Sequence, residues 1–489
     1  MCGIVGLIKN NQAIYDIIDA LIAIQHRGQD AAGAITYDGE RFHLKKGKSL
    51  VSDVFNEKNI NRLTGNVGLG HVRYPTIGEG SGEDAQPFYL NSPYGIAMIH
   101  NGNVANYNQL KQELYKSKNH INTSCDLEII LTIFAESLRS QGKSNSEAVF
   151  TAAKEVMTRV KGSYSVIGYI ANIGMFAFKD PHGIKPLCYG KKDNNIIFAS
   201  ESVVCDVLDY QTIREVKPGE VIWVPEITRD IISSTVLEKS YRPCIFEWVY
   251  FARPDSIISG KSVYQARYQM GCEIAREIKH KIDHADVVIP VPDTARTAAL
   301  AIAESMDIPY KEGLIKNRYI GRTFIMPEVK TRDYSMKHKL NPIISEISGK
   351  NVVLVDDSIV RGLTSRKIIK LVRSAGAKKI IFISTSPPIR HPCVYGIDMQ
   401  TSQELIAYKK SVEMIRKFIG ADQLFYLSIE GLIRSIQLKD ASLKFCDACF
   451  TGSYPGGITK EEIKLIEQFR SREKISLSQV SSPPLFTEE

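Results

Sequence analysis

Residues 352–365 read Val352-Val353-Leu354-Val355-Asp356-Asp357-Ser358-Ile359-Val360-Arg361-Gly362-Leu363-Thr364-Ser365. This stretch indicates the fold of the second half of the chain. Its four leading apolar residues are typical of a strand that is buried on both faces of a parallel sheet. A short polar loop follows, and apolar residues then recur at helical spacing from Ile368 to Val372. The loop is therefore predicted to join the carboxyl end of a strand to the amino end of a helix.

A loop in this position is predicted to bind an anion. The free N–H groups and the positive dipole end of the helix face it, and Gly362 allows a close approach. Two adjacent carboxylates would repel a phosphate unless they hold a divalent cation or bind sugar hydroxyls. The spacing matches neither the phosphate loop that ends in Gly-Lys-Ser/Thr nor the pattern G-x-G-x-x-G. An ordinary acidic turn is the simpler alternative.

The whole stretch resembles the signature of type I phosphoribosyltransferases, which bind phosphoribosyl pyrophosphate (PRPP) with magnesium. The resemblance assigns PRPP binding to Asp356, Asp357, Ser358, Arg361, Gly362, Thr364 and Ser365. It also implies one Mg²⁺ per subunit, held by Thr294, Asp356 and Asp357. Leu363 departs from the family pattern, in which threonine is common. The basic segment 316–324, which contains Arg322, is expected to be a lid over the pyrophosphate.

Length and composition are those of a globular enzyme. The 489 residues predict two or three domains, and 44% hydrophobic residues are enough for sizeable cores. The net charge of +8 is unclustered, so it favours anionic substrates at most, and no nucleic-acid motif occurs. No apolar run has the length of a membrane span and no signal sequence is recognised, so a cytoplasmic protein is expected. The nine scattered cysteines argue against a disulfide scaffold.

A cysteine stands second in the chain, between Met1 and Gly3. Removal of Met1 is expected before so small a residue, and it would give Cys2 a free α-amino group with a pKa of roughly 7.7 to 8.0. That amine can act as general base for the thiol of the same residue, which makes Cys2 a candidate nucleophile. A small buried hydrophobic residue is the alternative role for a cysteine at this position.

Four polar motifs follow Cys2. The first three are expected in loops and the fourth at the start of a helix; they are QHRGQD at 25–30, HVRYPT at 71–76, HNGN at 100–103 and SCDLE at 124–128. Their residue types suit the hydrolysis of glutamine by a thiol. Arginine can pair with the α-carboxylate, aspartate can hold the α-ammonium group, and an asparagine amide with a glycine N–H can form an oxyanion hole. Surface or turn roles are the alternative for each residue taken alone.

The series resembles the class II glutamine amidotransferases, which use an amino-terminal nucleophile, over residues 2–230. The resemblance assigns catalysis to Cys2, Asn101 and Gly102, and glutamine binding to Arg27, Gly28, Arg73 and Asp126. It also implies a four-layer α-β-β-α sandwich. The residues themselves predict only that short antiparallel strands fill the region 164–199.

Beyond residue 263 the apolar pattern alternates between helix and strand, which predicts a parallel sheet with ligands at the carboxyl ends of its strands. The expected fold class is therefore α/β and α+β in two domains. Residues 2–235 are the amidotransferase domain, residues 236–450 the phosphoribosyltransferase domain, and residues 451–489 a carboxyl-terminal helix and mobile tail. The aromatic segment 244–255 has too few charges for a linker and is expected to be buried between the domains.

An amino-terminal glutaminase joined to a PRPP domain resembles the amidophosphoribosyltransferases, a family of pentosyltransferases. The resemblance implies that PRPP, glutamine and water give 5-phosphoribosylamine, glutamate and pyrophosphate, the first committed step of purine synthesis. Ammonia would pass from Cys2 to the PRPP site. A homotetramer and feedback inhibition by purine nucleotides are also implied. Two alternatives stay open: a regulator that binds PRPP without turnover, and a class II amidotransferase with another acceptor.

Four cysteines from three distant segments form a further group, namely Cys244, Cys393, Cys446 and Cys449. Taken alone, the C-x-x-C at 446–449 is redox-active, zinc-binding or incidental. The four match positions at which one branch of the amidophosphoribosyltransferases ligates a 4Fe-4S cluster, which implies one structural cluster per subunit. Tetrahedral zinc is the alternative for four thiolates. The cysteines at 125, 188, 205 and 272 match no ligand position and are expected to be packing residues.

Overall fold

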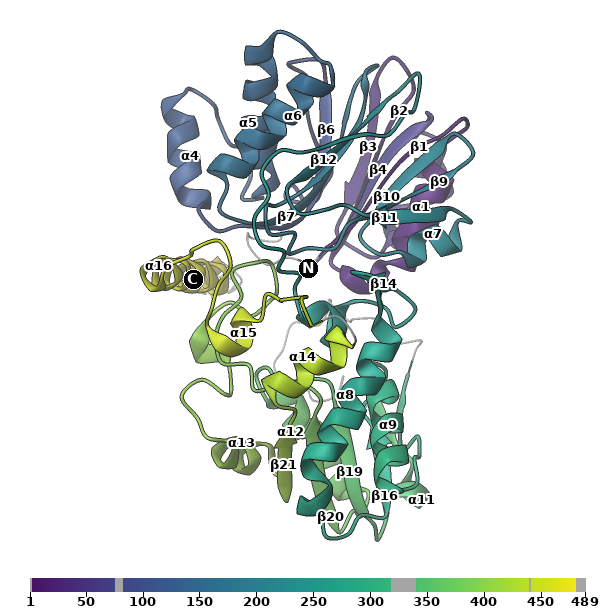
Figure 1. Ribbon diagram of the computed structural model, residues 1–489, viewed down its shortest axis with the longest axis vertical. Helices are drawn as coiled ribbons and strands as arrows, with labels where there is room; N and C mark the ends of the chain where they lie inside the picture. The colour runs from purple at the N-terminus through teal and green to yellow at the C-terminus, as the bar shows by residue number, and fades with distance from the viewer. Residues whose placement is uncertain (1, 75–81, 318–339, 439–440, 481–489) are drawn as a thin grey trace, which may run out of the picture.

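The computed structural model describes residues 2–74, 82–317, 340–438 and 441–480, with side chains up to Ser471. Two domains lie one above the other, and the connecting segments run through the junction between them (Figure 1). The upper domain holds two antiparallel sheets and the lower domain a parallel sheet. The expected combination of α+β and α/β domains is confirmed.

Two sheets form the core of the first domain. In the described part of the chain their strand orders are β11-β9-β10-β1-β4-β2-β3 and β13-β12-β8-β7-β6-β5. The first sheet contains β1 (Gly3–Ile8), β2 (Ala31–Tyr37), β3 (Phe42–Gly47), β4 (Val67–Arg73), β9 (Cys188–Lys192), β10 (Asn195–Ala199) and β11 (Gln211–Glu215). The second contains β5 (Phe88–Leu90), β6 (Ile96–Val104), β7 (Gly162–Ile170), β8 (Gly174–Lys179), β12 (Glu220–Pro225) and β13 (Ile232–Thr235).

Helices cover the outer face of each sheet, so the α-β-β-α sandwich is confirmed (Figure 1). On the first sheet pack α1 (Ile14–Ala23), α2 (Val51–Val54) and α7 (Val203–Val207), and on the second α4 (Tyr107–Lys116), α5 (Leu127–Gln141) and α6 (Ser146–Arg159). Between the sheets lies an apolar layer that includes Ile4, Leu69, Ile99 and Ile167. Because this layer clamps β1 and β4 against β6 and β7, polar residues near the ends of these strands are held close together.

Two motifs that were expected in loops lie in strands instead. β4 continues through His71 to Arg73, and β6 includes His100 to Asn103. The expectation fails because a polar side chain in a sandwich can find its partner far away in the sequence. Gln86, for example, hydrogen-bonds Nδ1 of buried His100 at 2.8 Å. Such partners leave no trace in the local polarity pattern.

A parallel sheet in the order β16-β19-β20-β21 is the core of the second domain within the described residues. Its strands are β16 (Val287–Pro290), β19 (Asn351–Asp356), β20 (Lys379–Ser384) and β21 (Gln423–Tyr426). One face, with Val353 and Val355, is covered by α8 (Val263–Ile278), α9 (Arg296–Met306) and α14 (Ile429–Gln437). The other face, with Val352 and Leu354, is covered by α12 (Leu363–Ser374) and α13 (Val412–Ile419). Burial on both faces explains the unbroken apolar run, and the strand, loop and helix predicted there are confirmed.

Short elements complete the two domains. They are α3 (Glu57–Ile60), α11 (Ile344–Ile347), two antiparallel strand pairs, β14 (Ile257–Ile258) with β15 (Lys261–Ser262) and β17 (Leu314–Lys316) with β18 (Leu340–Pro342), and the 3-10 turns η1 (Gln25–Arg27), η3 (Lys279–Lys281) and η4 (Ser402–Glu404). The expected lid begins at the end of β17. Its residues 318–324, Arg322 among them, lie outside the described residues.

The aromatic segment between the domains is buried at residues 244–249 and at Ala252, as expected, whereas Tyr250, Pro254 and Asp255 are exposed. It forms η2 (Glu247–Phe251), a single π-helical turn whose Trp248 is fully buried. The carboxyl-terminal elements α15 (Ala448–Thr451) and α16 (Lys460–Val480) return to the same junction (Figure 1). Phe450 of α15 packs against Phe246, with ring centroids 6.3 Å apart. Residues 481–489, the end of the expected tail, lie outside the described residues.

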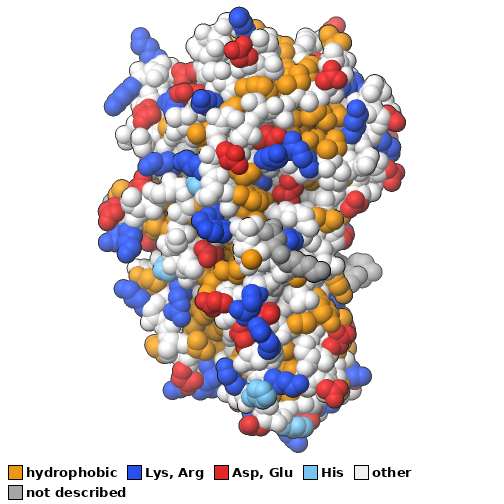
Figure 2. Space-filling model, viewed as in Figure 1, with side chains coloured by type: hydrophobic (Ala, Val, Ile, Leu, Met, Phe, Trp, Pro, Cys, Tyr) orange, Lys and Arg blue, Asp and Glu red, His pale blue; other side chains and the backbone are white. Residues whose placement is uncertain are grey.

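The surface shown in Figure 2 carries charges of both signs. On this face the lysines and arginines are interspersed with aspartates and glutamates, so the net charge of +8 forms no continuous basic surface here. None of the helices in the described ranges is long and apolar enough to cross a membrane.

Candidate active sites

The first candidate site lies in the first domain, next to the domain junction. Cys2 directly precedes β1, and its backbone nitrogen donates a hydrogen bond of 3.1 Å to Oδ1 of Asn101 in β6. Cys2 is partly exposed, whereas Asn101 is fully buried. Among the described residues, Nδ2 of Asn101 has no hydrogen-bond partner. One amide therefore holds the nitrogen of the predicted nucleophile and keeps a buried donor for another group.

Backbone from both domains supports strand β6. A Cβ on Gly102 would lie 2.0 Å from the carbonyl oxygen of Ser163 in β7, so only glycine fits there. Nδ2 of Asn103 donates to the carbonyl of Val394 at 2.8 Å, and Oγ of Ser163 donates to the carbonyl of Tyr395 at 2.9 Å. The second domain thus contacts the strand that carries the predicted oxyanion donors.

Arg73 and Asp126, the residues predicted to grip glutamine, lie close to this strand. Nη1 of Arg73 is 3.8 Å from Oδ2 of Asp84. Asp126 accepts the N–H of Val104 at 2.9 Å and lies 3.3 Å from Nε2 of His100. Burial works to raise the pKa of Asp126, but His100, the Val104 N–H and Arg73 outweigh it and hold the pKa below its usual value. Asp126 is therefore a carboxylate, as the binding of an ammonium group requires.

Arg27 and Gly28 lie in and just after the turn that follows α1. Nε of buried Arg27 donates to the carbonyl of Cys2 at 3.0 Å. Its guanidinium also binds Glu201 at 2.5 Å and Glu247 at 2.8 Å. A Cβ on Gly28 would lie 2.5 Å from the backbone nitrogen at position 73. Arg27 therefore fixes the backbone of the nucleophile, and Gly28 lets the turn pack against the end of β4.

Sequence reasoning missed Glu201 and Glu247, the two carboxylates that hold Arg27. Both side chains are buried. Glu247 could have been predicted from the sequence, because it is the only charged residue in the run 244–252 and a buried charge needs a partner. No feature of the sequence marks Glu201, since it stands between two serines in a stretch typical of an ordinary polar turn.

The second candidate site lies at the carboxyl end of β19. Asp356 ends this strand, and Oγ of Ser358 donates to Oδ1 of Asp357 at 2.7 Å. The hydroxyl of Thr294, in the loop before α9, also donates to Asp357. Burial raises the pKa of both carboxyls, and the charge of Asp357 raises that of Asp356 further. A cation at this buried pair would let both groups carry their charge, so the donor set fits a divalent ion.

The loop then turns into α12. Gly362 has a φ of +75°, and a Cβ there would lie 2.3 Å from Cδ1 of Ile406. The turn therefore requires glycine on both conformational and steric grounds. Thr364 is exposed and Ser365 is buried in the first turn of the helix. Their position at the helix start agrees with the predicted anion site.

Arg361 lies on the side of the loop that faces the first domain. Its guanidinium binds Oε2 of Glu404 at 2.7 Å and lies 3.5 Å from Oδ2 of Asp398. The hydroxyl of Tyr74, from the first domain, contacts the same oxygen of Asp398 at 3.5 Å. Arg361 thus takes part in a contact between the domains.

Two family models match the chain, a glutamine amidotransferase domain over residues 71–205 and a phosphoribosyl transferase domain over residues 261–389. The chain is 47% identical over 484 residues to the amidophosphoribosyltransferase of Pasteurella multocida, a match that covers 96% of each chain. It is 46% identical to the amidophosphoribosyltransferase of Escherichia coli, over 94% of this chain and 93% of the relative. The chain belongs to the amidophosphoribosyltransferase family.

A solved structure of the family has the same fold as this chain. It is the glutamine PRPP amidotransferase from Bacillus subtilis complexed with ADP and GMP, with a TM-score of 0.85, 39% identity, and coverage of 94% of this chain and 98% of that chain. The reaction that the sequence predicts is the reaction of the family: PRPP, glutamine and water give 5-phosphoribosylamine, glutamate and pyrophosphate, the first committed step of purine synthesis.

Four buried cysteines form a third candidate site. Cys244 and Cys446 are neighbours in a parallel β-bridge. The carbonyl of Cys449 accepts the N–H of Arg390 at 2.9 Å, three residues before Cys393. Burial raises the pKa of Cys244 to about 11 and those of Cys446 and Cys449 well above the usual value, and the neighbouring thiols raise all three further. The three segments therefore meet around four thiol groups.

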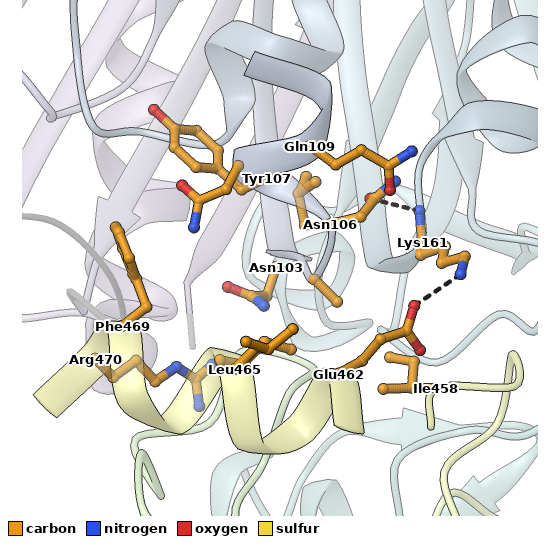
Figure 3. Close-up of a pocket in the computed structure, with 14 residues that line it drawn as sticks. Asn103, Asn106, Tyr107, Gln109, Lys161, Ile458, Glu462, Leu465, Phe469 and Arg470 are labelled. Atoms are coloured by element: carbon orange, nitrogen blue, oxygen red, sulfur yellow. Dashed lines mark hydrogen bonds and ion pairs between the residues drawn. The ribbon is translucent and has the colours of Figure 1, made fainter. Parts of the chain in front are cut away.

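A pocket opens between α16 and the residues at and after the end of β6 (Figure 3). Nζ of Lys161 and Oε1 of Glu462 form an ion pair of 2.8 Å on one side, and Asn103 and Phe469 lie on others. None of the predicted site residues is part of its lining in the described chain. The pocket is thus a neighbour of the glutaminase strand and separate from the three candidate sites.

Proposed function

We propose that Cys2 is the nucleophile that hydrolyses glutamine. After removal of Met1, the nitrogen held by Asn101 is the α-amine, which takes the thiol proton as the sulfur attacks the side-chain amide carbon of glutamine. Nδ2 of Asn101 and the N–H of Gly102 then stabilise the oxyanion. The protonated α-amine returns its proton to the departing nitrogen as the intermediate collapses to a thioester and ammonia. Water then hydrolyses the thioester and frees glutamate and the thiol. The proposal is carried by the hydrogen bond between Cys2 and Asn101, together with the free buried donor on the same amide.

Glutamine binding is assigned within the same proposal. Arg73 pairs with the α-carboxylate and Asp126 with the α-ammonium group. The negative charge of Asp126 and its position beside β6 support this assignment. The Arg27 guanidinium already binds two glutamates. Arg27 and Gly28 therefore contribute to the wall of the glutamine pocket by positioning its backbone.

Ammonia is consumed at the PRPP site. We assign one Mg²⁺ per subunit to Thr294, Asp356 and Asp357, and the phosphates of PRPP to Ser358, Arg361, Gly362, Thr364, Ser365 and Arg322, the last on resemblance alone. When bound, the cation neutralises the pyrophosphate and makes it a better leaving group. The protein itself contributes the amino end of α12, whose N–H groups favour a phosphate. Attack of ammonia on C1 of the ribose forms the C–N bond and releases pyrophosphate.

The replacement Cys2→Ala tests this division of labour. Glutamine-dependent formation of phosphoribosylamine should fall by at least about a thousandfold, because the nucleophile is lost. Synthesis from added ammonium chloride should stay within about twofold of wild type, because the PRPP site is intact. Cys272→Ala, another partly exposed cysteine, is the matched control and should keep both activities. Equal loss of both activities in folded Cys2→Ala would contradict the assignment.

We also propose that Cys244, Cys393, Cys446 and Cys449 hold one 4Fe-4S cluster per subunit. The parallel β-bridge between Cys244 and Cys446 and the backbone hydrogen bond from Arg390 to Cys449 bring the three segments together, which supports a site of four thiolates. The choice of a cluster over a single zinc ion rests on the family resemblance. The charge of buried Lys185 acts on Cys244 and Cys446, so it would offset the charge of thiolate ligands.

Metal analysis tests the cluster. Protein purified without oxygen should be brown and contain about four irons and four acid-labile sulfides per chain. Replacement of Cys446 by serine should lower the iron content, whereas replacement of Cys125, which lies in the first domain, should not. Active, colourless protein with one zinc per chain would contradict the proposal.

Two further assignments, the homotetramer and the inhibition by purine nucleotides, rest on the family resemblance. We propose a cytoplasmic homotetramer that purine nucleotides inhibit, and the ADP and GMP complex of the Bacillus subtilis relative supports nucleotide binding. Sedimentation tests the oligomeric state, and initial rates with added GMP and ADP test the inhibition.

We place the domain boundaries at 235/236 and 450/451. The end of β13 at Thr235 and the start of the interdomain segment soon afterwards support the first boundary.

A further inference from the structure

The pocket between α16 and the end of β6 contains none of the residues assigned to the two half-reactions (Figure 3). Residues 103–109 and Lys161 form one wall, and Ile458 and one face of α16 form the other. The volume of the pocket is about 210 Å³. An apolar cavity of about 150 Å³ in another protein binds benzene. The pocket therefore has room for a molecule of one or two rings.

The surface of this pocket is mainly apolar. Leu465 and Phe469 of α16 line it, although 65% and 38% of their surface is exposed. On the opposite wall lies Tyr107, the first residue of α4. Large apolar side chains that stay exposed inside a hollow of the surface are typical of a site that binds an apolar group.

The charged groups of the walls are engaged within the protein. Nζ of Lys161 pairs with Oε1 of Glu462 at 2.8 Å, so these two charges are matched. Arg470 is 4% exposed, and its Nη1 donates to two backbone carbonyls at 2.9 and 3.2 Å. The amide of Asn106 is also engaged, because it accepts the N–H of Lys161 at 2.9 Å and donates to the carbonyl of Arg159 at 3.0 Å. These contacts favour a neutral ligand over an ionic one.

Asn103 gives the wall one polar atom without a partner. Its Nδ2 donates to the carbonyl of Val394 at 2.8 Å, which fixes the amide. Its Oδ1 accepts no hydrogen bond from the described residues, although the side chain is only 1% exposed. Figure 3 shows this amide between α4 and α16, with its oxygen on the side of Phe469. A buried carbonyl oxygen without a donor is unfavourable, so the wall offers an acceptor to the N–H group of a ligand.

We propose that this pocket binds a small neutral molecule that has an apolar body of one or two rings and one N–H donor. The body lies against Leu465 and Phe469, and the N–H group donates to Oδ1 of Asn103. This oxygen lies beneath the pocket surface, and the partly exposed ring of Phe469 turns aside to admit the donor. The bound molecule joins α16 to β6. The inference goes beyond the proposed reaction and does not depend on the roles of Cys2 or of the PRPP loop.

Equilibrium dialysis of the complete protein with two probes tests the proposal. Indole has two fused rings and one N–H donor, and N-methylindole has the same rings without the donor. Wild type should bind indole saturably at one molecule per chain, and N-methylindole about tenfold more weakly, because the hydrogen bond is lost. Equal affinity for the two probes would overturn the proposal. So would the absence of saturable indole binding up to about 1 mM, a usual range for a ligand of this size.

Two replacements place the probe in the pocket. Leu465→Ser changes an exposed side chain and should weaken indole binding by at least about fivefold, because apolar contact is lost. Ile227→Ser, at a position 93% exposed between β12 and β13, is the matched control and should keep the affinity within about twofold. Asn103→Leu removes the acceptor and should abolish the preference for indole over N-methylindole. Unchanged indole binding in Leu465→Ser, or an unchanged preference in folded Asn103→Leu, would overturn the proposal.

Two other occupants of the pocket give different results. Deletion of residues 481–489, which include Leu485 and Phe486, should leave the affinity for indole within about twofold of wild type. A rise of about tenfold or more would show that this segment competes for the pocket, and would overturn the assignment to a small molecule. Leu465→Ser should sediment as wild type does. A smaller assembly would assign the α16 wall to a contact with a second copy of the chain, which would also overturn the proposal.

Discussion

At the scale of single residues, Asn101 performs two tasks with one side chain. Its Oδ1 accepts from the nitrogen of Cys2, and its Nδ2 has no partner among the described residues. An amide is the only side-chain group that offers a fixed acceptor and a fixed donor on one carbon without a charge. Aspartate would lose the donor and bring a negative charge next to the oxyanion.

The variant Asn101→Ala measures the value of that amide. Glutamine-dependent kcat should fall by about 10² to 10³, the usual loss for one oxyanion donor, while ammonia-dependent synthesis is retained. Asn145→Ala is a suitable control, because Oδ1 of Asn145 only caps α6 by accepting the N–H of Ala148 at 3.1 Å. This control should lose about 1 kcal/mol of unfolding free energy and no glutaminase activity. An unchanged kcat in Asn101→Ala would contradict the proposed oxyanion hole.

At the scale of elements, strand β6 is held by a segment of the other domain. The carbonyls of Val394 and Tyr395 accept hydrogen bonds from Asn103 and Ser163, and this segment directly follows the proposed cluster ligand Cys393. Nη1 of Arg470 in α16 donates to the carbonyl of Cys393 at 2.9 Å. The carboxyl-terminal helix, the cysteine site and the glutaminase strand therefore form one supported unit.

Gly396→Ala should disturb this support. Gly396 has a φ of +92°, and a Cβ there would lie 2.8 Å from the carbonyl oxygen of Gly102. The expected result is a loss of about 1 to 3 kcal/mol of unfolding free energy from backbone strain, together with a larger fall in glutamine-dependent than in ammonia-dependent activity. Gly39→Ala is the matched control, since Gly39 has a φ of +98° with no atom within 4 Å of the added carbon. Gly39→Ala should lose unfolding free energy and no glutaminase activity. A similar loss of glutaminase activity in Gly39→Ala would contradict the proposed role of the contact between residues 396 and 102.

At the scale of the whole molecule, the two domains share a buried set of charges. Arg27 and Glu201 come from the first domain, and Glu247 comes from the segment between the domains. Burial works to raise the pKa of Glu201, but Arg27 and His26 outweigh it and hold the pKa well below its usual value. A carboxyl with a lowered pKa stabilises the folded state above its unfolded pKa of about 4.3, and this contribution is lost as the pH falls further.

Glu201→Gln should therefore be most destabilising at neutral pH. Breaking a buried ion pair costs about 3 to 5 kcal/mol. The difference in unfolding free energy between wild type and variant should be largest near pH 7 and should shrink as the pH falls below about 4.3, where the wild-type carboxyl loses its advantage. Urea titrations at several pH values measure this. Glu147→Gln, at an exposed position on α6, should show almost no difference at neutral pH. A pH-independent difference for Glu201→Gln would contradict the assignment.

Features that depend on neighbours along the chain could be predicted from the residues. The apolar run, the two acids, the glycine and the helical spacing of residues 352–376 predicted strand, loop and helix, because each element follows from residues within a few positions of one another. The residue types of the glutaminase motifs likewise predicted the chemistry. These predictions did not require a knowledge of which segments touch.

Contacts between distant segments could not be predicted from the residues and are seen in the folded chain. Cys2 forms a hydrogen bond with Asn101, 99 positions away in the sequence, and Arg27 forms one with Glu247, 220 positions away. The polar motifs at 71–73 and 100–103 lie in strands because the sandwich supplies partners that local polarity cannot reveal. Such contacts depend on how two sheets and two domains bury their apolar faces against each other. That packing is set by the whole chain, and the period of any single segment contains no information about it.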